Sequence, residues 1–545
     1  MSLKPTPYQA IPAETVRVAK AAFPKGNLCI WLRDEIGTLF WDEQFTDLYP
    51  RRGQPAMSPW QLAVVTVFQF AENLTDRQAA DAVRGRIDWK YALSLELTDP
   101  GFDFSVLSEF RMRLLRNEAE ARLFDILLQH CTERNWLKVR GRQRTDSTHV
   151  LGAIRNLNQL ELVGEAVRHT LNTLAHVAPD WLQPRIHPDW LNRYQQPLSD
   201  YRLPDNEAER QQLAIQMGCD GIQLLEHIYD KTAPEWLCQV PAVETLRRIW
   251  VQQFYFYEDV LRWRIDHDPP PGQAICSPYD TEARYARKRN NTWVGYRVHL
   301  SETCEDDKPN LITNVMTTAA SVADIKALDD IHCSLDVHQR LPDEHIVDAG
   351  YVSSDTLVSS RKWYDIDLVG PVRPDPSWQA KEADAYDITR FTVDWTQQVA
   401  ICPQGKMSQK WKNRVGKRGK PNILVGFSEK DCQPCSARAL CTRGKRRNIT
   451  LQQREEFEAL RAAQIRQQQE DFQDKYAVRA GVEGTISQAA FAFGLRRARY
   501  RGEEKVRLEH LLTATALNLS RVFHWATGTK RSTTRRAAFA KLVAA

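Results

Sequence analysis

The sequence predicts an α/β protein in which an all-helical N-terminal part precedes a core of strands and helices. Two observations predict this fold class. Residues 58–135 carry apolar side chains at helical spacing, whereas later runs carry β-branched residues or alternate apolar and polar ones. The later elements follow the order strand, strand, strand, helix, strand.

Length and composition exclude several classes of protein. The chain has 545 residues, 42 % hydrophobic and 26 % charged, which is a globular composition with room for about three or four domains. It contains no apolar run near the roughly 20 residues of a membrane helix. The N-terminus lacks the apolar segment of a secretory signal. We therefore expect a cytoplasmic protein without membrane contact.

The N-terminal part, residues 1–135, is predicted to be a helical domain. Its first 55 residues are rich in proline and are expected to be irregular. Helices then begin at Pro59 and at the capping box that starts at Thr75, and one further helix is expected over about 105–131. Short helices with tight turns are typical of a DNA-binding helix-turn-helix module, although all-helical domains without DNA contact share the pattern.

The core elements come next, separated by two long insertions. A strand signal begins near Trp136, and residues 155–275 return to a helical, acidic pattern that indicates an insertion. A second, basic insertion is expected over 362–463, and a polar helical pattern runs from Leu451 towards Phe493. The remaining core elements are strands at 293–303, 311–317 and 345–348 and a helix at about 322–337.

Positive charge is concentrated in two segments. Residues 401–450 carry 13 Lys and Arg against two acidic residues, and residues 484–545 carry 12 against three, so the rest of the chain is acidic. This pattern favours a polyanion such as nucleic acid as partner, but a solvated basic surface is equally compatible with it.

Three acidic residues fall where a catalytic site would need them. Asp146 lies inside the first strand, and Asp348 ends a strand just before Gly350, at an edge where open α/β sheets place their sites. Glu483 lies in the late helical segment. If that segment is one helix, Tyr476, Arg479 and Glu483 share a face.

Three converging carboxylates need a counter-charge, and Mg²⁺ supplies it with the oxygen coordination it prefers. Two such ions can activate a water or a 3′-hydroxyl and stabilise the leaving oxygen of a phosphodiester. Taken singly, each acid is more often a turn, a cap or a surface residue, so the prediction depends on their combination.

Four cysteines, Cys402, Cys432, Cys435 and Cys441, cluster within forty residues. Their number and spacing are those of a structural Cys₄ zinc site, and we expect the surrounding Lys and Arg to lower the pKa values of the thiols. The alternative is four reduced thiols in a loop-rich insertion.

The motifs around the three acids resemble a known family. TDST at 145–148, VDAGYVSSD at 347–355 and the Tyr476, Arg479, Glu483 spacing are similar to bacterial insertion-sequence DDE transposases of the IS eleven-eighty-two type, whose core is RNase H-like. The N-terminal helices and the run FGLRRARYRG at 493–502 also resemble the family, so the likeness covers about residues 30–525. The Lys of the Tyr-Arg-Glu-Lys signature is replaced by Ala490.

The resemblance implies a mixed RNase H-like sheet in residues 136–525, interrupted by the two insertions and followed by a basic tail over 526–545. It implies cleavage and joining of DNA strands at the terminal inverted repeats of the element. Asp146, Asp348 and Glu483 would bind Mg²⁺ or Mn²⁺. Residues expected to contact DNA are Tyr476, Arg479, Arg496, Arg497 and Arg499.

The resemblance also implies double-stranded DNA as partner, a homo-oligomer on DNA, and a location at the bacterial nucleoid. Two alternatives stay open. An RNase H-like nuclease or resolvase would cut without joining, using the same carboxylates. A catalytically inactive DNA-binding relic would keep only the basic segments.

Overall fold

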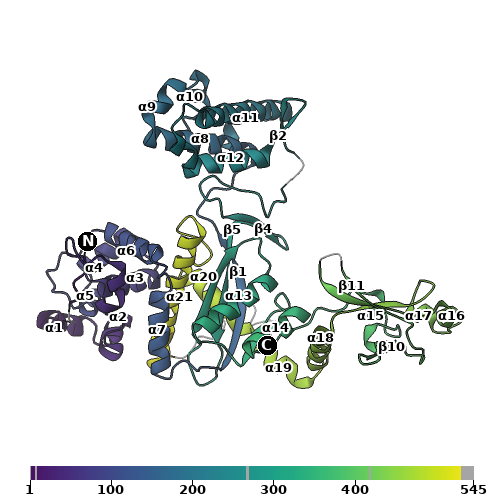
Figure 1. Cartoon of the computed structure of the whole chain (residues 1–545). Helices are drawn as coiled ribbons and strands as arrows, with labels where there is room; N and C mark the ends of the chain where they lie inside the picture. Colours follow the sequence, from purple (N-terminus) through teal and green to yellow (C-terminus); the bar gives the residue numbers. More distant parts are fainter. Residues whose placement is uncertain (1, 7–8, 266–268, 417–418, 530–545) are drawn as a thin grey trace, which may run out of the picture.

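The computed structural model describes residues 2–6, 9–265, 269–416 and 419–529. The fold is mixed α/β, and a central sheet lies beside a helical N-terminal lobe, with two further lobes projecting from it (Figure 1). The predicted tail beyond residue 529 lies outside the described residues.

The central sheet is mixed, with strand order β6-β5-β1-β7-β8 and with β4 paired to the start of β5. β1 runs antiparallel to β5 and parallel to β7, and β7 runs parallel to β8. The predicted core strands are therefore confirmed, while β4 and β8 are additional. The strands are β1 (Arg142–Leu151), β4 (Arg284–Lys288), β5 (Asn291–Thr303), β6 (Ile312–Ala319), β7 (Glu344–Val347) and β8 (Asp367–Val369).

Helices cover both faces of this sheet. β1 directs Arg144 towards α20 on one face and Ser147 towards α13 on the other. The predicted helix at 322–337 is confirmed as α13. The helices packed around the sheet are α13 (Asp324–Val337), α14 (Ser354–Tyr364), α20 (Ala480–Ala492) and α21 (Glu503–Ala526).

The N-terminal lobe is helical, as predicted, and its apolar core continues into α20, α21 and the strands β5 and β6. Figure 1 shows α21 lying between this lobe and the sheet. The capping box at Thr75 is present. The lobe contains α1 (Ala13–Ala22), α2 (Leu28–Trp31), η1 (Leu32–Ile36), η2 (Asp42–Leu48), α3 (Pro59–Ala71), α4 (Asp76–Gly85), α5 (Ile87–Ala92), α6 (Ser105–Arg116) and α7 (Arg122–Glu133).

Two predictions about this lobe were wrong. Short helices lie within residues 13–48, where an irregular chain was expected, because buried Ala19 and Ile30 pack against Tyr91 of α5, a contact that no local pattern reveals. The single helix expected over 105–131 is broken into α6 and α7. Glu118 adopts a left-handed conformation (φ 53°), and the amide of Ala119 bonds back to Leu114, which ends α6.

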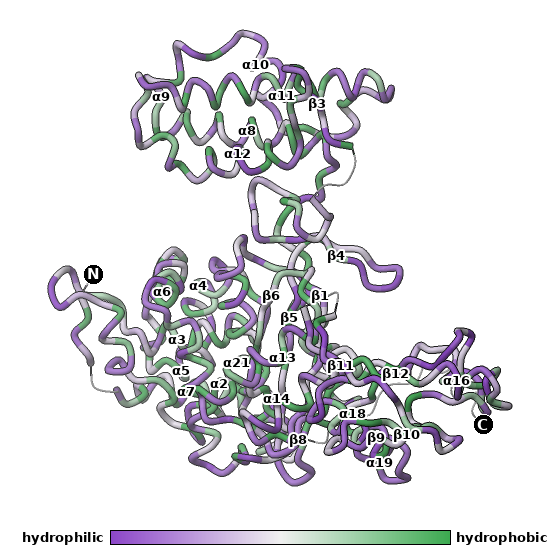
Figure 2. The backbone as a smooth tube through the Cα atoms, turned by 45° about the vertical axis from the view of Figure 1, so that its right-hand side comes forward, coloured by the Kyte–Doolittle hydropathy of each residue, from purple (hydrophilic) through white to green (hydrophobic). Residues whose placement is uncertain are grey.

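The first insertion folds around an apolar core of its own, from Leu160 to Ile275. It stands apart from the sheet, and hydrophobic segments run along its helices (Figure 2). It is helical as predicted, with an added hairpin of β2 and β3. Its elements are α8 (Gln159–Val177), α9 (Pro179–Leu182), η3 (Gln183–Arg185), α10 (Pro188–Tyr194), η4 (Asp200–Arg202), α11 (Glu207–Tyr229), η5 (Glu235–Gln239), α12 (Pro241–Gln253), β2 (Phe254–Tyr257) and β3 (Val260–Trp263).

The second insertion contains small sheets around a compact apolar cluster that includes Phe391, Val425 and Phe427. Helices α18 (Arg454–Gln467) and α19 (Glu470–Ala477) lead back to the core. The insertion contains α15 (Trp378–Lys381), η6 (Ile388–Arg390), β9 (Thr392–Asp394), β10 (Val399–Ile401), β11 (Lys410–Val415), β12 (Pro421–Gly426), α16 (Glu429–Cys432), α17 (Arg438–Cys441) and β13 (Asn448–Leu451).

Among the described residues, none of the helices combines the length and the apolar character that crossing a lipid bilayer requires.

Candidate active site

Asp146 and Asp348 come from neighbouring parallel strands. The register pairs Thr145 of β1 with Val347 of β7, so the two aspartates follow at matching positions. Asp146 lies within β1, and Asp348 follows the last residue of β7 directly. Because the strands run in the same direction about 4.8 Å apart, this register brings the two carboxylates to one part of the sheet.

Gly350 is explained by the Asp348 carboxylate. Its amide donates a hydrogen bond to Asp348 Oδ1 at 2.7 Å, and a Cβ at this position would lie 2.8 Å from the same oxygen. A side chain would therefore displace the carboxylate. Lack of space therefore explains the glycine at this position.

The environment of Asp146 disfavours its charge. Burial raises the pKa of the Asp146 carboxyl, and the nearby negative charge of Asp348 raises it too. The Ser147 amide, which donates to Oδ1 at 2.7 Å, and the Arg479 guanidinium act in the opposite direction. A carboxylate in such a place gains from a bound cation.

Glu483 reaches this cluster through Arg479. The Arg479 guanidinium donates to Asp146 Oδ2 at 3.0 Å and to Glu483 Oε1 at 2.5 Å, so it bridges the two carboxylates. The Asp146 side chain is 14 % exposed and that of Glu483 61 % exposed. Glu483 therefore lies on the solvent side of the bridge.

The single helix expected for Tyr476, Arg479 and Glu483 was wrong. Tyr476 belongs to α19, Arg479 precedes α20, and Glu483 lies in the first turn of α20. The chain bends between the two helices because Arg144 Nη1 donates to the carbonyl of Val478 at 2.5 Å. The three side chains still meet across this bend.

Tyr476 lies beside Arg479 and shields the cluster. Its ring stacks on Phe472, with ring centroids 5.8 Å apart, and the Arg479 guanidinium lies 5.7 Å from its centroid. Burial raises the pKa of Tyr476, and the charges of Asp348 and Asp146 contribute. Its phenol therefore stays protonated and can act as a hydrogen-bond donor.

A buried ionic network fastens α20 to the sheet, and sequence reasoning missed it. Glu302 of β5 is fully buried and receives hydrogen bonds from Arg144, Thr485 and Arg521. The two arginines hold the pKa of Glu302 below its usual value despite burial. Arg144 precedes Asp146 by two residues, so its position on the same face of the strand was the available signal.

A fourth carboxylate, Asp324 of α13, lies beneath the site. Its Oδ1 accepts hydrogen bonds from Ser147 Oγ at 2.8 Å and from Arg297 at 2.7 Å. Because Ser147 also donates its amide to Asp146, Asp324 supports the strand segment that presents Asp146. Nothing in the sequence around Asp324 indicated this contact.

The three arginines after α20 differ in their surroundings. Arg496 Nε donates to Thr148 Oγ1 at 3.0 Å, two residues along β1 from Asp146. Arg497 is exposed. Arg499 instead points into the N-terminal lobe, where it donates to the carbonyl of Leu74 at 3.0 Å and lies over the Phe70 ring. The structure thus brings Arg496 near the site and leaves Arg499 inside an intramolecular contact.

Two family models match the chain. Residues 17–113 match a transposase domain (DUF772), and residues 401–523 match a transposase DDE domain. In these two segments the chain is similar to transposases, the second of them to the DDE type. The DDE match contains Glu483, Arg479 and Tyr476 as well as the four clustered cysteines. Neither the curated proteins nor the solved structures yielded a match.

The four cysteines of the DDE match line one small cavity of about 30 Å³, together with Phe427 and Arg447. The amide of Lys406 donates to Cys402 Sγ at 3.3 Å. The expectation that basic neighbours lower the thiol pKa values was wrong for Cys441, whose pKa is raised to about 11 by burial, with Arg447 opposing.

The carboxylates and thiols of the candidate sites can be compared with the ligands that metal ions prefer. Within the described ranges, no three His, Cys, Asp or Glu side chains are grouped to hold one ion as they stand. The Asp146 and Asp348 pair nevertheless has the chemistry that Mg²⁺ uses, since one or two carboxylates and substrate phosphates suffice for it. The thiols likewise have the chemistry that zinc prefers.

Proposed function

We propose that the chain is a DNA transposase of the IS eleven-eighty-two type, which cleaves and joins DNA strands at the terminal inverted repeats of its own insertion sequence. The observation that carries this proposal is the meeting of Asp146, Asp348 and the Arg479–Glu483 pair across two parallel strands and α20. The two transposase matches support it. The strand order of the mixed sheet supports an RNase H-like core.

The proposed metal ligands are Asp146, Asp348 and Glu483. A bound Mg²⁺ or Mn²⁺ would supply charge stabilisation and an activated water or 3′-hydroxyl for phosphodiester chemistry. Asp146 fits this role because burial and Asp348 disfavour its charge in the absence of a cation. Glu483 is exposed enough to turn from Arg479 towards an ion.

Arg479 and Tyr476 are proposed to steady the DNA. When the carboxylates bind a cation, the Arg479 guanidinium is available to a phosphate, which it can bind with two parallel hydrogen bonds. The protonated phenol of Tyr476, held by Phe472, can donate to the same phosphate group. Arg496, beside Thr148, and the exposed Arg497 would bind the next part of the backbone.

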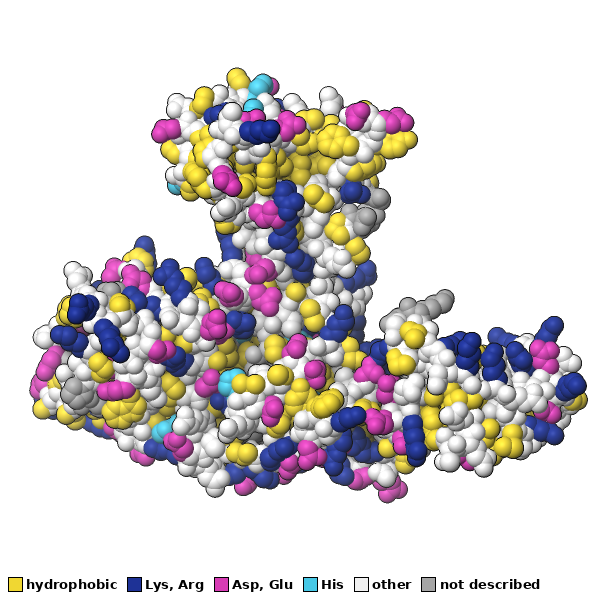
Figure 3. All heavy atoms as spheres, viewed as in Figure 1, with side chains coloured by type: hydrophobic (Ala, Val, Ile, Leu, Met, Phe, Trp, Pro, Cys, Tyr) yellow, Lys and Arg dark blue, Asp and Glu magenta, His cyan; other side chains and the backbone are white. Residues whose placement is uncertain are grey.

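A second DNA-binding surface is proposed on the lobe of β11. Lys410, Lys412 and Arg414 are exposed on this strand, and Figure 3 shows Lys and Arg side chains gathered along that edge of the lobe. Residues 1–135 would recognise the element ends. Because two ends must be joined, we propose a homo-oligomer on double-stranded DNA, at the nucleoid of a bacterial cytoplasm.

The test is metal-dependent cleavage and joining of DNA taken from either side of the gene. Wild type is compared with Asp146→Asn and Glu483→Gln. We expect nicks at the repeat ends and joined products with Mg²⁺ or Mn²⁺ in wild type only, with binding of the DNA ends retained in both variants.

The other outcomes identify the alternatives. Cutting without joining would favour a nuclease or resolvase. Binding without cutting in all three proteins would favour a relic, and cutting by Glu483→Gln would remove Glu483 from the ligand set.

We further propose that Cys402, Cys432, Cys435 and Cys441 bind a structural Zn²⁺. The cavity that they share supports this proposal. Zinc content measured on the purified protein should be one per chain and should fall in Cys435→Ser, and a chelator should lower the melting temperature of wild type. Equal melting with and without chelator would refute the zinc site.

A further inference from the structure

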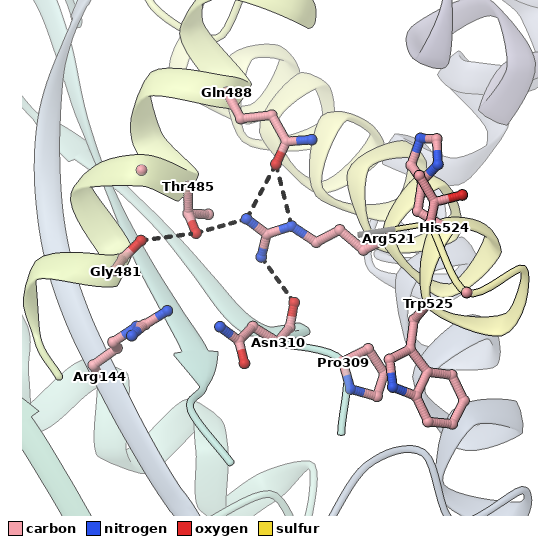
Figure 4. Close-up of a pocket in the computed structure, with 12 residues that line it drawn as sticks. Arg144, Pro309, Asn310, Gly481, Thr485, Gln488, Arg521, His524 and Trp525 are labelled. Carbon is pink, nitrogen blue, oxygen red and sulfur yellow. Dashed lines mark hydrogen bonds between the residues drawn. The ribbon is translucent and has the colours of Figure 1, made fainter. Parts of the chain in front are cut away.

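A groove of about 910 Å³ runs along the side of α20 (Figure 4). One wall is α20, the other is the C-terminal end of α21, and Pro309 and Asn310 close it between them. None of the proposed catalytic residues lines this groove. Its lining residues include Arg144, Gly481, Gly484, Gln488, Arg521 and Trp525.

The groove carries a net positive charge. Arg144 and Arg521 both line it, and both pair with the same buried carboxylate, Glu302, so one guanidinium charge is left uncompensated. Arg521 also donates to Gln488 Oε1 at 3.2 Å. This contact orients the Gln488 amide, whose NH₂ group faces away from Arg521 as a hydrogen-bond donor.

The α20 wall is open down to the backbone. Among the described residues, none outside the neighbouring part of α20 has a heavy atom within 4 Å of the position where a Cβ of residue 484 would stand, so a ligand can approach the helix closely there. Gly484 also follows Glu483 directly. Since a helix with its side chains is about 10 Å across, the groove lies within roughly one helix width of the proposed catalytic carboxylates.

The far wall offers an aromatic surface and the positive charge of Arg521. Trp525 is 41 % exposed and rests edge-on against Trp136, 6.2 Å between centroids, which holds its ring in place. His524 and Thr529 lie beside it. Aromatic faces beside positive charge are the usual means of binding a single nucleic-acid strand.

We infer that this groove binds a DNA strand next to the scissile phosphate, with its backbone near Gln488 and Arg144 and a base against Trp525. The inference rests on the proposed function, since it adds the path of the DNA to the same site. The strand can come from the element, its flank or the target, and the test below separates these sources.

The first measurement is DNA affinity in the full chain, by fluorescence anisotropy with duplex carrying the element end. Gln488→Glu keeps the acceptor for Arg521 but adds a negative charge in the groove. The matched control is Gln464→Glu, because Gln464 on α18 also accepts from an arginine, Arg461, outside the groove. We expect about fivefold weaker binding for Gln488→Glu at low salt, less at high salt, and less than twofold change for the control.

The second measurement is photo-cross-linking. A benzophenone amino acid replaces Trp525 in one protein and Trp363 of α14, which is 71 % exposed, in another. We expect cross-links to DNA at 525 only. Sequencing of the cross-linked strand with element, flank or target labelled shows which of them occupies the groove.

Equal affinity of Gln488→Glu and Gln464→Glu, or no cross-link at 525, in a protein that cuts and joins DNA would overturn the groove inference and leave the proposed function standing. The reverse result, weaker binding and a cross-link in a protein that never cuts, would keep the groove and reject the transposase activity. A wild type that binds no DNA would reject both.

Discussion

At the scale of single residues, Arg479 holds the candidate site together. It is the only residue of the described chain with hydrogen bonds to both Asp146 and Glu483. Its planar guanidinium satisfies two carboxylates at once, which a lysine ammonium cannot do with the same geometry. Arg479 therefore provides the positive charge that both acids share.

We predict that Arg479→Lys lowers the rate of single-turnover DNA cleavage by about 100-fold, a typical cost of losing a positioned charged donor. The fold should persist, because Arg479 is partly exposed, and thermal melting checks this. Cleavage within threefold of wild type would mean that the guanidinium geometry does not matter.

Two glycines of α20 give a matched pair of predictions. A Cβ at Gly481 would lie 2.1 Å from the Arg144 guanidinium, which Glu302 and Val478 hold in place, whereas a Cβ at Gly484 meets nothing. We expect Gly481→Ala to destabilise the fold by about 1–3 kcal/mol. Gly484→Ala should stabilise it by up to about 1 kcal/mol, because alanine favours helix. Urea unfolding measures both changes in stability. Equal effects would contradict the view that Arg144, held by Glu302 and Val478, packs tightly against α20 at Gly481.

At the scale of elements, the buried ionic network around Glu302 fixes α20 on the sheet and so determines where Glu483 lies. Glu302 of β5 joins β1 through Arg144, α20 through Thr485 and α21 through Arg521. A buried charge of this kind is stabilised only while its partners remain. The network therefore ties four elements into one rigid support for the site.

We predict that Glu302→Gln destabilises the protein by about 3–5 kcal/mol, since it leaves the buried Arg144 and the partly buried Arg521 without their carboxylate. Glu302→Asp, which keeps the charge, should recover part of this loss and part of the metal-dependent cleavage. Chemical denaturation and cleavage rates are the measurements. A neutral effect of Glu302→Gln would show that the arginines find other partners.

The elements also show what sequence patterns can predict. The core strands and α13 follow from local periodicity, and Asp146 and Asp348 follow from their places in those strands. The bend between α19 and α20 could not be predicted, because it depends on Arg144, more than 330 residues away along the chain. The same holds for Asp324 and Glu302, whose importance comes only from tertiary contacts.

At the scale of the whole molecule, each of the two insertions has its own apolar core. The N-terminal lobe and the sheet instead share a third core. The helical, acidic pattern of residues 155–275 and the basic character of residues 362–463 predicted the two insertions, and each has a core of its own. The shared core was not predictable from sequence, because α21 contributes to it from the other end of the chain. The N-terminal lobe and the sheet are therefore packed together through α21.

Several histidines are buried in their neutral form, and this makes the stability of the fold sensitive to acid. Burial lowers the pKa of His332 to about 4 and that of His510 to about 3, and it lowers the pKa of His345 as well. The unfolded chain binds protons near pH 6.5 and the folded one does not, so stability falls as pH decreases from 6.5 towards 4. Glu509, with a pKa of about 7, acts in the opposite direction between pH 4.5 and 7.

We predict that His510→Gln reduces this loss. His510 shares a hydrogen bond of 2.7 Å with Thr317 of β6 through Nδ1, and glutamine can keep a hydrogen bond to Thr317 without taking up a proton. At pH 7.5 the variant should lie within about 1 kcal/mol of wild type. Between pH 6.5 and 4 it should lose about 3 kcal/mol less of its unfolding free energy, because over this range of about 2.5 pH units the unfolded wild type binds a proton at position 510 and the folded one does not. Urea unfolding at several pH values tests this, and parallel pH profiles of the two proteins would show that His510 is not the group responsible.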